Sequence, residues 1–208
     1  MARYFEGING PFMGKVGKVI GTTYKGKPIM KGLGDLRVDH PTDAQLLSRA
    51  RLSMMTIFLT RISTVLQIGF PAKGREITSV NKAMKINMKT ALNFSAPAAE
   101  INYPELQIAK GTLPGSYKPG IQAAGNFQVR FFWDHFPMSN PNDLITILCY
   151  CPALNTSHRF INTAKRSALE FLANFGEAFL DKEIHSWILF SNGIIASNSI
   201  YLGKITVT

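Results

Sequence analysis

The chain has 208 residues, of which 46% are hydrophobic and 17% are charged. This composition supports a substantial core and excludes a collagen, a coiled coil, a low-complexity tail and a disulfide-stapled miniprotein. Lysine and arginine number 23 against 13 acidic residues, which gives a formal net charge of +10. Residues 1–94 carry fifteen of the basic and five of the acidic side chains, and residues 95–208 carry eight of each. Any anionic partner is therefore to be sought at the first 94 residues.

Export and membrane signals are not expected in this sequence. Residues 1–7 lack the apolar stretch and the small-residue cleavage site of a secretory signal peptide. No apolar run approaches the roughly 18 residues that a transmembrane helix requires. Cys149 and Cys151 stand two residues apart, a spacing that does not favour a mutual disulfide. We expect two reduced, packed thiols in a protein that is cytoplasmic or part of an assembled particle.

Residues 1–40 form a region rich in glycine and lysine. Eight of the seventeen glycines lie between residues 7 and 34. Residues 15–24, a turn at 25–27 and residues 28–31 predict a β-hairpin in an extended arm, because many glycines weaken an independent strand and permit close backbone approach. The apolar residues of this arm are candidates for an assembly interface: Phe12, Val16, Val19, Ile20, Tyr24 and Ile29.

Residues 41–95 predict a pair of helices. Thr42 and Gln45 fit a capping box, and apolar residues recur at three- and four-residue steps as far as Gly69 and Pro71. This pattern predicts a first helix of about 25 residues. A second helix is expected from residue 78 or 79 to about residue 92, with three lysines along one face.

Residues 96–208 have the pattern of a β domain. Strands are expected at 101–110, 126–133, 144–151, 168–173, 184–190 and 201–207, with shorter ones near 159–162 and 194–199. Asn192-Gly193 is the strongest hairpin signal. A helix over 167–181 is an alternative to the strand at 168–173, because apolar residues there also recur at helical spacing. The fold class is therefore α+β, with an antiparallel immunoglobulin- or fibronectin-like β-sandwich after the arm and the helices.

The motifs of common catalytic sites do not occur in the sequence. Residues 10–16 lack the spacing and the hydroxyl of a phosphate-binding loop. The four histidines stand far apart, and Asp134-His135 has no nucleophile context. Glu177, Asp181 and Glu183 are interpreted as solvated loop charges. The aromatic residues between 127 and 136 are interpreted as core. We expect no enzyme, no cofactor and no metal.

Four phrases spread along the chain carry a family resemblance: GPFMGKVGKVIG at 10–21, PTDAQ at 41–45, KGTLPG at 110–115 and SNSIYLG at 197–203. They resemble a family of small uncharacterised proteins, found chiefly in Bacteroidetes, that carries a domain of unknown function. The resemblance covers most of the chain and implies a two-part layout. It implies no activity and no catalytic residues.

Two functions follow as hypotheses. The first is a non-enzymatic structural protein that assembles with copies of itself through the arm into a filament, tube, shell or phage-like particle. The alternative is a protein that binds nucleic acid, or an acidic protein surface, through the basic residues of 1–94. The candidate basic residues are Lys15, Lys18, Lys25, Lys27, Lys31, Lys82, Lys85 and Lys89.

Overall fold

The structure is a computed structural model that describes residues 2–4, 6–7, 10–34, 39–72, 77–93 and 100–208. It divides into two compact units, Met1–Thr42 and Asp43–Thr208. The second unit contains both the helices and the β-strands that sequence analysis assigned to separate regions, 41–95 and 96–208.

The N-terminal unit, Met1–Thr42, is a four-stranded antiparallel sheet. Its strands occur in the order β1 (Arg3–Tyr4), β2 (Phe12–Val16), β3 (Val19–Tyr24) and β4 (Lys27–Gly32). The turn between β3 and β4 lies at Lys25-Gly26, where the hairpin turn was predicted. The prediction of one continuous strand over 15–24 was wrong, because the chain reverses at Gly17-Lys18 and separates β2 from β3.

Three helices begin the second unit: α1 (Asp43–Arg61), α2 (Ser63–Gly69) and α3 (Ser79–Thr90). The prediction of a single 25-residue helix was wrong, since α1 and α2 are bent by 81° at Ile62. Ile62 is fully buried, and its carbonyl accepts hydrogen bonds from Val65 N and Leu66 N. The apolar spacing continues through this bend, so periodicity alone does not reveal it. The predicted second helix is confirmed as α3, whose N-cap Thr78 accepts from Asn81 N at 3.2 Å.

Two antiparallel sheets follow the helices. The four-stranded sheet has the order β10 (Thr156–Lys165), β9 (Leu144–Cys151), β12 (Glu183–Ser191) and β13 (Ile200–Thr206). The three-stranded sheet has the order β11 (Glu170–Asn174), β8 (Gln128–Asp134) and β7 (Tyr117–Gly125). Short elements complete the unit: β5 (Leu92–Asn93), β6 (Glu100–Ile101), and the 3-10 turns η1 (Tyr103–Glu105), η2 (Arg166–Ala168) and η3 (Glu177–Phe179).

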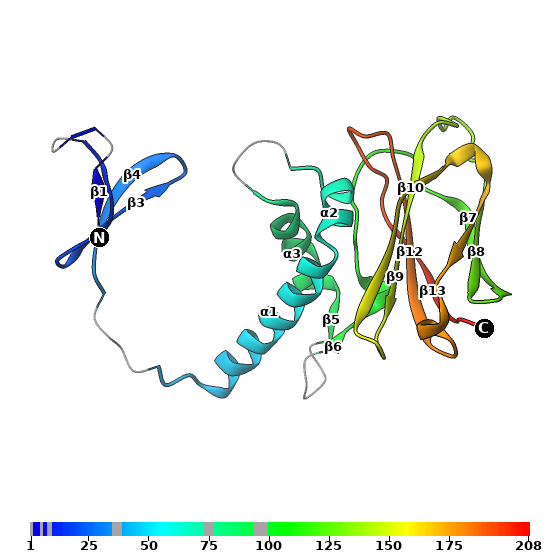
Figure 1. Ribbon diagram of the computed structural model, residues 1–208, viewed down its shortest axis with the longest axis horizontal. Coiled ribbons are helices and arrows are strands. Elements are labelled where there is room, and N and C mark those ends of the chain that lie inside the picture. The colour runs from blue at the N-terminus through cyan, green and yellow to red at the C-terminus, as the bar shows by residue number, and fades with distance from the viewer. Residues whose placement is uncertain (1, 5, 8–9, 35–38, 73–76, 94–99) are drawn as a thin grey trace. The chain divides into compact units, whose positions relative to one another are not determined.

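The second unit has three layers, helices, four-stranded sheet and three-stranded sheet, which Figure 1 shows side by side. Alternate residues of β9 enter different cores. Leu148 and Tyr150 pack with the helices, whereas Ile147 and Cys149 pack with the other sheet. Because β9 and β12 are covered on both faces, their sequences are nearly continuous apolar runs.

Most of the predicted strands correspond to observed ones. The strands predicted at 126–133, 144–151, 184–190 and 201–207 are confirmed as β8, β9, β12 and β13. The strand predicted at 168–173 is largely confirmed as β11, and the alternative helix over 167–181 is wrong. The prediction at 159–162 falls within the longer β10. Strand β7 was missed, because Pro119 and Gly120 interrupt its pattern and a register irregularity occurs there.

The strands predicted at 101–110 and 194–199 were wrong. Backbone amides in the first segment donate to side chains rather than to a neighbouring strand. Gln107 N donates to Asn87 Oδ1 at 2.8 Å, and Ile108 N donates to Ser199 Oγ at 3.0 Å. Residues 194–199 contribute only isolated bridges, and the Asn192-Gly193 turn opens into a loop in which Asn192 Oδ1 accepts from Ile194 N and Ile195 N. Side-chain acceptors thus replace the ladder hydrogen bonds that a strand would supply.

Candidate interaction surfaces

The sheet of the N-terminal unit has two chemically different faces. Registry between β2, β3 and β4 places Lys15 beside Ile20, Ile20 beside Lys31, and Tyr24 beside Lys27. Because side chains alternate along a strand, these residues share one face with Ile29. We call it the basic face: Lys15, Ile20, Thr22, Tyr24, Lys27, Ile29 and Lys31.

The opposite face of the same strands carries no charge. We call it the uncharged face: Val16, Val19, Gly21, Thr23, Pro28, Met30 and Gly32. The start of β2 folds over part of it, since a side chain at position 21 would overlap the carbonyl oxygen and the ring of Phe12. Glycine at position 21 is therefore required for this contact. Val16, Val19 and Met30 remain 46%, 38% and 72% exposed.

The predicted assembly residues are divided between these two faces. Phe12, Val16 and Val19 belong with the uncharged face, whereas Ile20, Tyr24 and Ile29 lie among the lysines. Sequence reasoning missed Met30, although its alternation with Ile29 in β4 was a signal that the two point to opposite faces.

The predicted nucleic-acid lysines belong to both units. Lys15, Lys27 and Lys31 lie on the basic face, and Lys18 and Lys25 lie in the two turns of the same sheet. Lys82, Lys85 and Lys89 lie on α3 in the second unit, beside an apolar groove of about 710 Å³. Lys110 also lines this groove. Sequence reasoning missed it, because no motif or spacing connects Lys110 with the lysines of α3.

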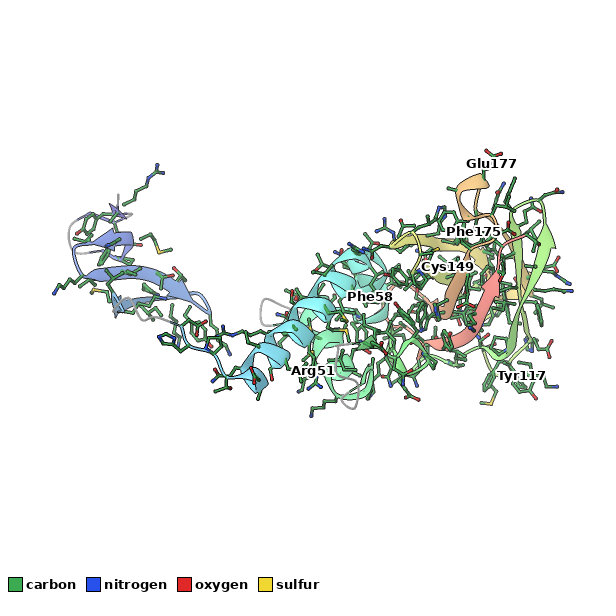
Figure 2. The ribbon with its side chains drawn as sticks, turned by 90° about the horizontal axis from the view of Figure 1, so that it is seen from below. Arg51, Phe58, Tyr117, Cys149, Phe175 and Glu177 are labelled. Carbon is green, nitrogen blue, oxygen red and sulfur yellow. The ribbon has the colours of Figure 1, made fainter. Side chains whose placement is uncertain are left out.

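A second groove, of about 770 Å³, lies between α1 and aromatic residues of the sheet region. The Phe58 ring, labelled in Figure 2, is 5.0 Å from the ring of Tyr150, and Tyr103 is 5.6 Å from Tyr150. Burial, with smaller contributions from the Tyr150 charge and hydrogen bond, raises the pKa of Tyr103 to about 12. At neutral pH this phenol is protonated, so it offers no base.

His158 and His185 each lie against aromatic side chains. His185 Nδ1 lies 2.7 Å from Tyr201 Oη, and His158 packs 4.9 Å from the Phe179 ring. Burial lowers the pKa of both rings. Within the described ranges no group of three or more His, Cys, Asp or Glu side chains is placed to hold a metal ion.

Cys149 and Glu183 lie in different environments, one buried and one exposed. Cys149, which Figure 2 labels, lies between the two sheets, and burial raises its pKa to about 12. Ser186 donates a hydrogen bond to its sulfur at 3.6 Å. The interpretation of Glu183 as a loop charge was wrong, because Glu183 begins β12, where it pairs with Lys204 at 2.9 Å, and both side chains are largely exposed. The thiol is a packed structural group and the ion pair is a surface one.

Two of the sequence phrases meet in the structure and hold one another. Asn198 Oδ1 accepts from Gly111 N at 3.2 Å, and Ser199 Oγ accepts from Ile108 N and Ala109 N. A side chain at position 111 would overlap the Ala196 carbonyl oxygen. Hydrogen bonds and close backbone packing thus hold residues 108–111 against residues 196–199.

The described helices were compared with the length and apolar content that a membrane span requires. None of them taken singly has the length and apolar content to cross a bilayer, while α1 and α2 together pass that test of length and composition despite their 81° bend.

The observed class of the protein is α+β, with three helices and several antiparallel sheets among the described residues. The chain belongs to a family of unknown function, DUF6266, whose model matches residues 11–203. This confirms the expectation of an uncharacterised domain family. No curated protein matches the chain.

Proposed function

We propose that the protein is a non-enzymatic structural protein that self-assembles through its N-terminal unit into a filament, tube, shell or phage-like particle. One observation carries the proposal. Among the described residues of 1–42, Gly21 alone is buried, so this sheet has no buried side chain. Chains this short rarely fold without a partner or another source of stability, and a small isolated sheet is marginal in water.

The charge distribution selects the face that packs against another copy. Two basic faces repel each other, because Lys15, Lys27 and Lys31 would approach their own counterparts. The uncharged face removes Val16, Val19 and Met30 from water without burying a charge. Self-association therefore uses the uncharged face.

The fold of the second unit suits a scaffold for such an assembly. Strand order β11-β8-β7 against β10-β9-β12-β13 supports an immunoglobulin-like sandwich of the fibronectin type. Folds of this class serve many functions, so the assignment of function rests on the N-terminal unit.

The test exploits two adjacent residues of β4 that point to opposite faces. Met30→Lys places a charge on the uncharged face, and Ile29→Lys places the same charge on the basic face. Size-exclusion chromatography with light scattering measures the mass of each protein over a concentration series. We expect oligomers for the wild type and for Ile29→Lys, and monomers for Met30→Lys. A wild type that stays monomeric at high concentration with its N-terminal sheet folded would refute self-assembly.

Nucleic-acid binding is the second candidate, and the basic face favours it. Tyr24 lies beside Lys27, is 63% exposed and is able to stack on a base, and Lys15 and Lys31 lie farther along the same face beside Ile20. Under this hypothesis Lys15→Gln, Lys27→Gln and Lys31→Gln together weaken retention of single-stranded DNA or RNA and reduce its salt dependence. No retention by the wild type at about 50 mM salt would remove this candidate.

A further inference from the structure

The groove beside α3 combines an apolar floor with a basic rim. Phe70, Ile77 and Ile86 supply apolar lining, and Ile77 is 49% exposed. Lys82, Lys85 and Lys89 come from α3 and span about 10 Å of helix. Lys110 comes from a different segment, which is tied to the end of α2 by the hydrogen bond from Lys110 N to Gly69 O.

Among the residues that the structure describes, the cations of this rim have no acidic neighbour. No acidic residue is among the described residues that line the groove. Lys82 Nζ donates to the Pro71 carbonyl at 2.5 Å, which fixes that side chain. Lys85, Lys89 and Lys110 are exposed, and in the described ranges none of them has an acidic partner within ion-pair distance.

The number of cations and the shape of the groove select among anionic ligands. A fatty acid offers one carboxylate to four lysines and needs an enclosing cavity, whereas this groove is open to solvent. A nucleic acid gains little from isoleucines, and the single aromatic ring of the lining, Phe70, is 4% exposed and cannot stack on bases. An amphipathic helix with acidic flanks satisfies both the apolar floor and the several lysines.

We propose that this groove is a docking site for an acidic amphipathic helix of a partner protein. Apolar side chains spaced at i, i+3 or i+4, and i+7 lie on Ile77 and Ile86, and carboxylates on both sides of them pair with Lys85, Lys89 and Lys110. All residues that line this groove belong to the second unit. The proposal assigns Lys82, Lys85 and Lys89 to peptide binding rather than to nucleic-acid binding.

The experiment uses the full chain and a fluorescent synthetic peptide of about 16 residues with a leucine face flanked by glutamates. Fluorescence anisotropy gives the Kd for the wild type, for Lys85→Glu with Lys89→Glu, and for Ile77→Ser. The matched control is Lys118→Glu with Lys165→Glu, which makes the same change of charge at exposed sites outside the groove. A peptide with lysines in place of glutamates and one with scrambled leucines control for charge and for amphipathicity.

We expect the Lys85/Lys89 variant to raise the Kd at least about tenfold and the Lys118/Lys165 control to raise it less than about threefold. Ile77→Ser is expected to weaken binding at constant salt, and the scrambled peptide is expected to bind poorly. Equal loss in the groove and control variants would overturn the proposal, because it would indicate binding by net charge alone. So would no binding of the acidic peptide by the wild type, or tighter Lys85- and Lys89-dependent binding of single-stranded DNA or of laurate.

Discussion

The Arg166 guanidinium lies 3.2 Å from the Asp143 carboxylate, and each of the two side chains is only 1% exposed. Arg166 also donates to the carbonyl oxygens of Pro114 and Gly115 at 2.7 and 2.8 Å, and it lies 3.8 Å from the Phe190 ring centre. This buried group therefore fixes the loop before β7 against η2 and the start of β9.

Arg166→Met is expected to destabilise the protein by about 3–5 kcal/mol, because it leaves the Asp143 carboxylate buried without its counter-charge. Replacing both partners, with Arg166→Met and Asp143→Leu together, is expected to cost less than Arg166→Met alone. Urea unfolding monitored by circular dichroism measures these differences. The exposed pair Arg130–Glu170 supplies the control, and Arg130→Met is expected to change stability by less than about 1 kcal/mol. A double variant less stable than Arg166→Met would contradict this account.

Ser199→Ala is expected to cost about 1–3 kcal/mol, because it removes the acceptor of the Ile108 and Ala109 amides. Ser167→Ala changes an exposed serine and is expected to stay within about 0.5 kcal/mol of the wild type. The same urea titration measures both, and hydrogen exchange at residues 108 and 109 locates the effect. Equal stability of the two variants would show that the hydrogen bonds of Ser199 do not contribute to the free energy of unfolding.

Acidic pH is expected to weaken the fold through His158 and His185. Burial lowers the pKa of each ring below the ordinary 6.5. The charge of Arg159 lowers the pKa of His158 further, whereas at His185 the Glu183 charge opposes the effect of burial and the Lys204 charge adds to it. Below pH 6.5 the unfolded chain binds protons at these rings that the folded chain does not bind. The free energy of unfolding is therefore unaffected by these rings above pH 6.5 and decreases as the pH falls below that value. Urea unfolding at about pH 7.5 and about pH 5.5 tests this. Replacing both histidines by glutamine should reduce the difference between the two pH values, and an unchanged difference would exclude these rings as the source.

The thiols are expected to be inert in the native protein. Cys149 and Cys151 are 1% and 0% exposed, and the pKa of Cys149 is raised to about 12. Ellman's reagent at mildly alkaline pH should therefore detect no thiol in the native protein and both thiols in concentrated guanidinium chloride. Rapid reaction of either thiol without denaturant would show that the core between the two sheets opens readily.

The strands and helices that local pattern determines were predictable. A nearly continuous apolar run marks β9, and apolar residues at helical spacing mark α3. The bend at Ile62 was not predictable, because packing of α2 on the sheet overrides a helical pattern that runs through it. The residues of 101–110 have strand composition, but their partners Asn87 and Ser199 lie far away in sequence.

The sequence predicted which residues the candidate surfaces contain, but not how these residues are arranged. The sequence identified the apolar and basic residues of the N-terminal sheet, but their division into two faces depends on the reversal at Gly17-Lys18, which sets the registry of β2 on β3. Tertiary folding brings Lys110 beside the lysines of α3, so the spacing of lysines in the sequence does not predict this cluster.

Strand β4 lies at one edge of the described N-terminal sheet, and Pro28 lies within it. Proline has no amide hydrogen, so an incoming strand would find a donor missing from the ladder, and the lysines of β4 add charge repulsion. Extension of this sheet from chain to chain into amyloid-like fibrils is thereby discouraged. The self-association proposed above is therefore expected to use the faces of this sheet rather than its β4 edge.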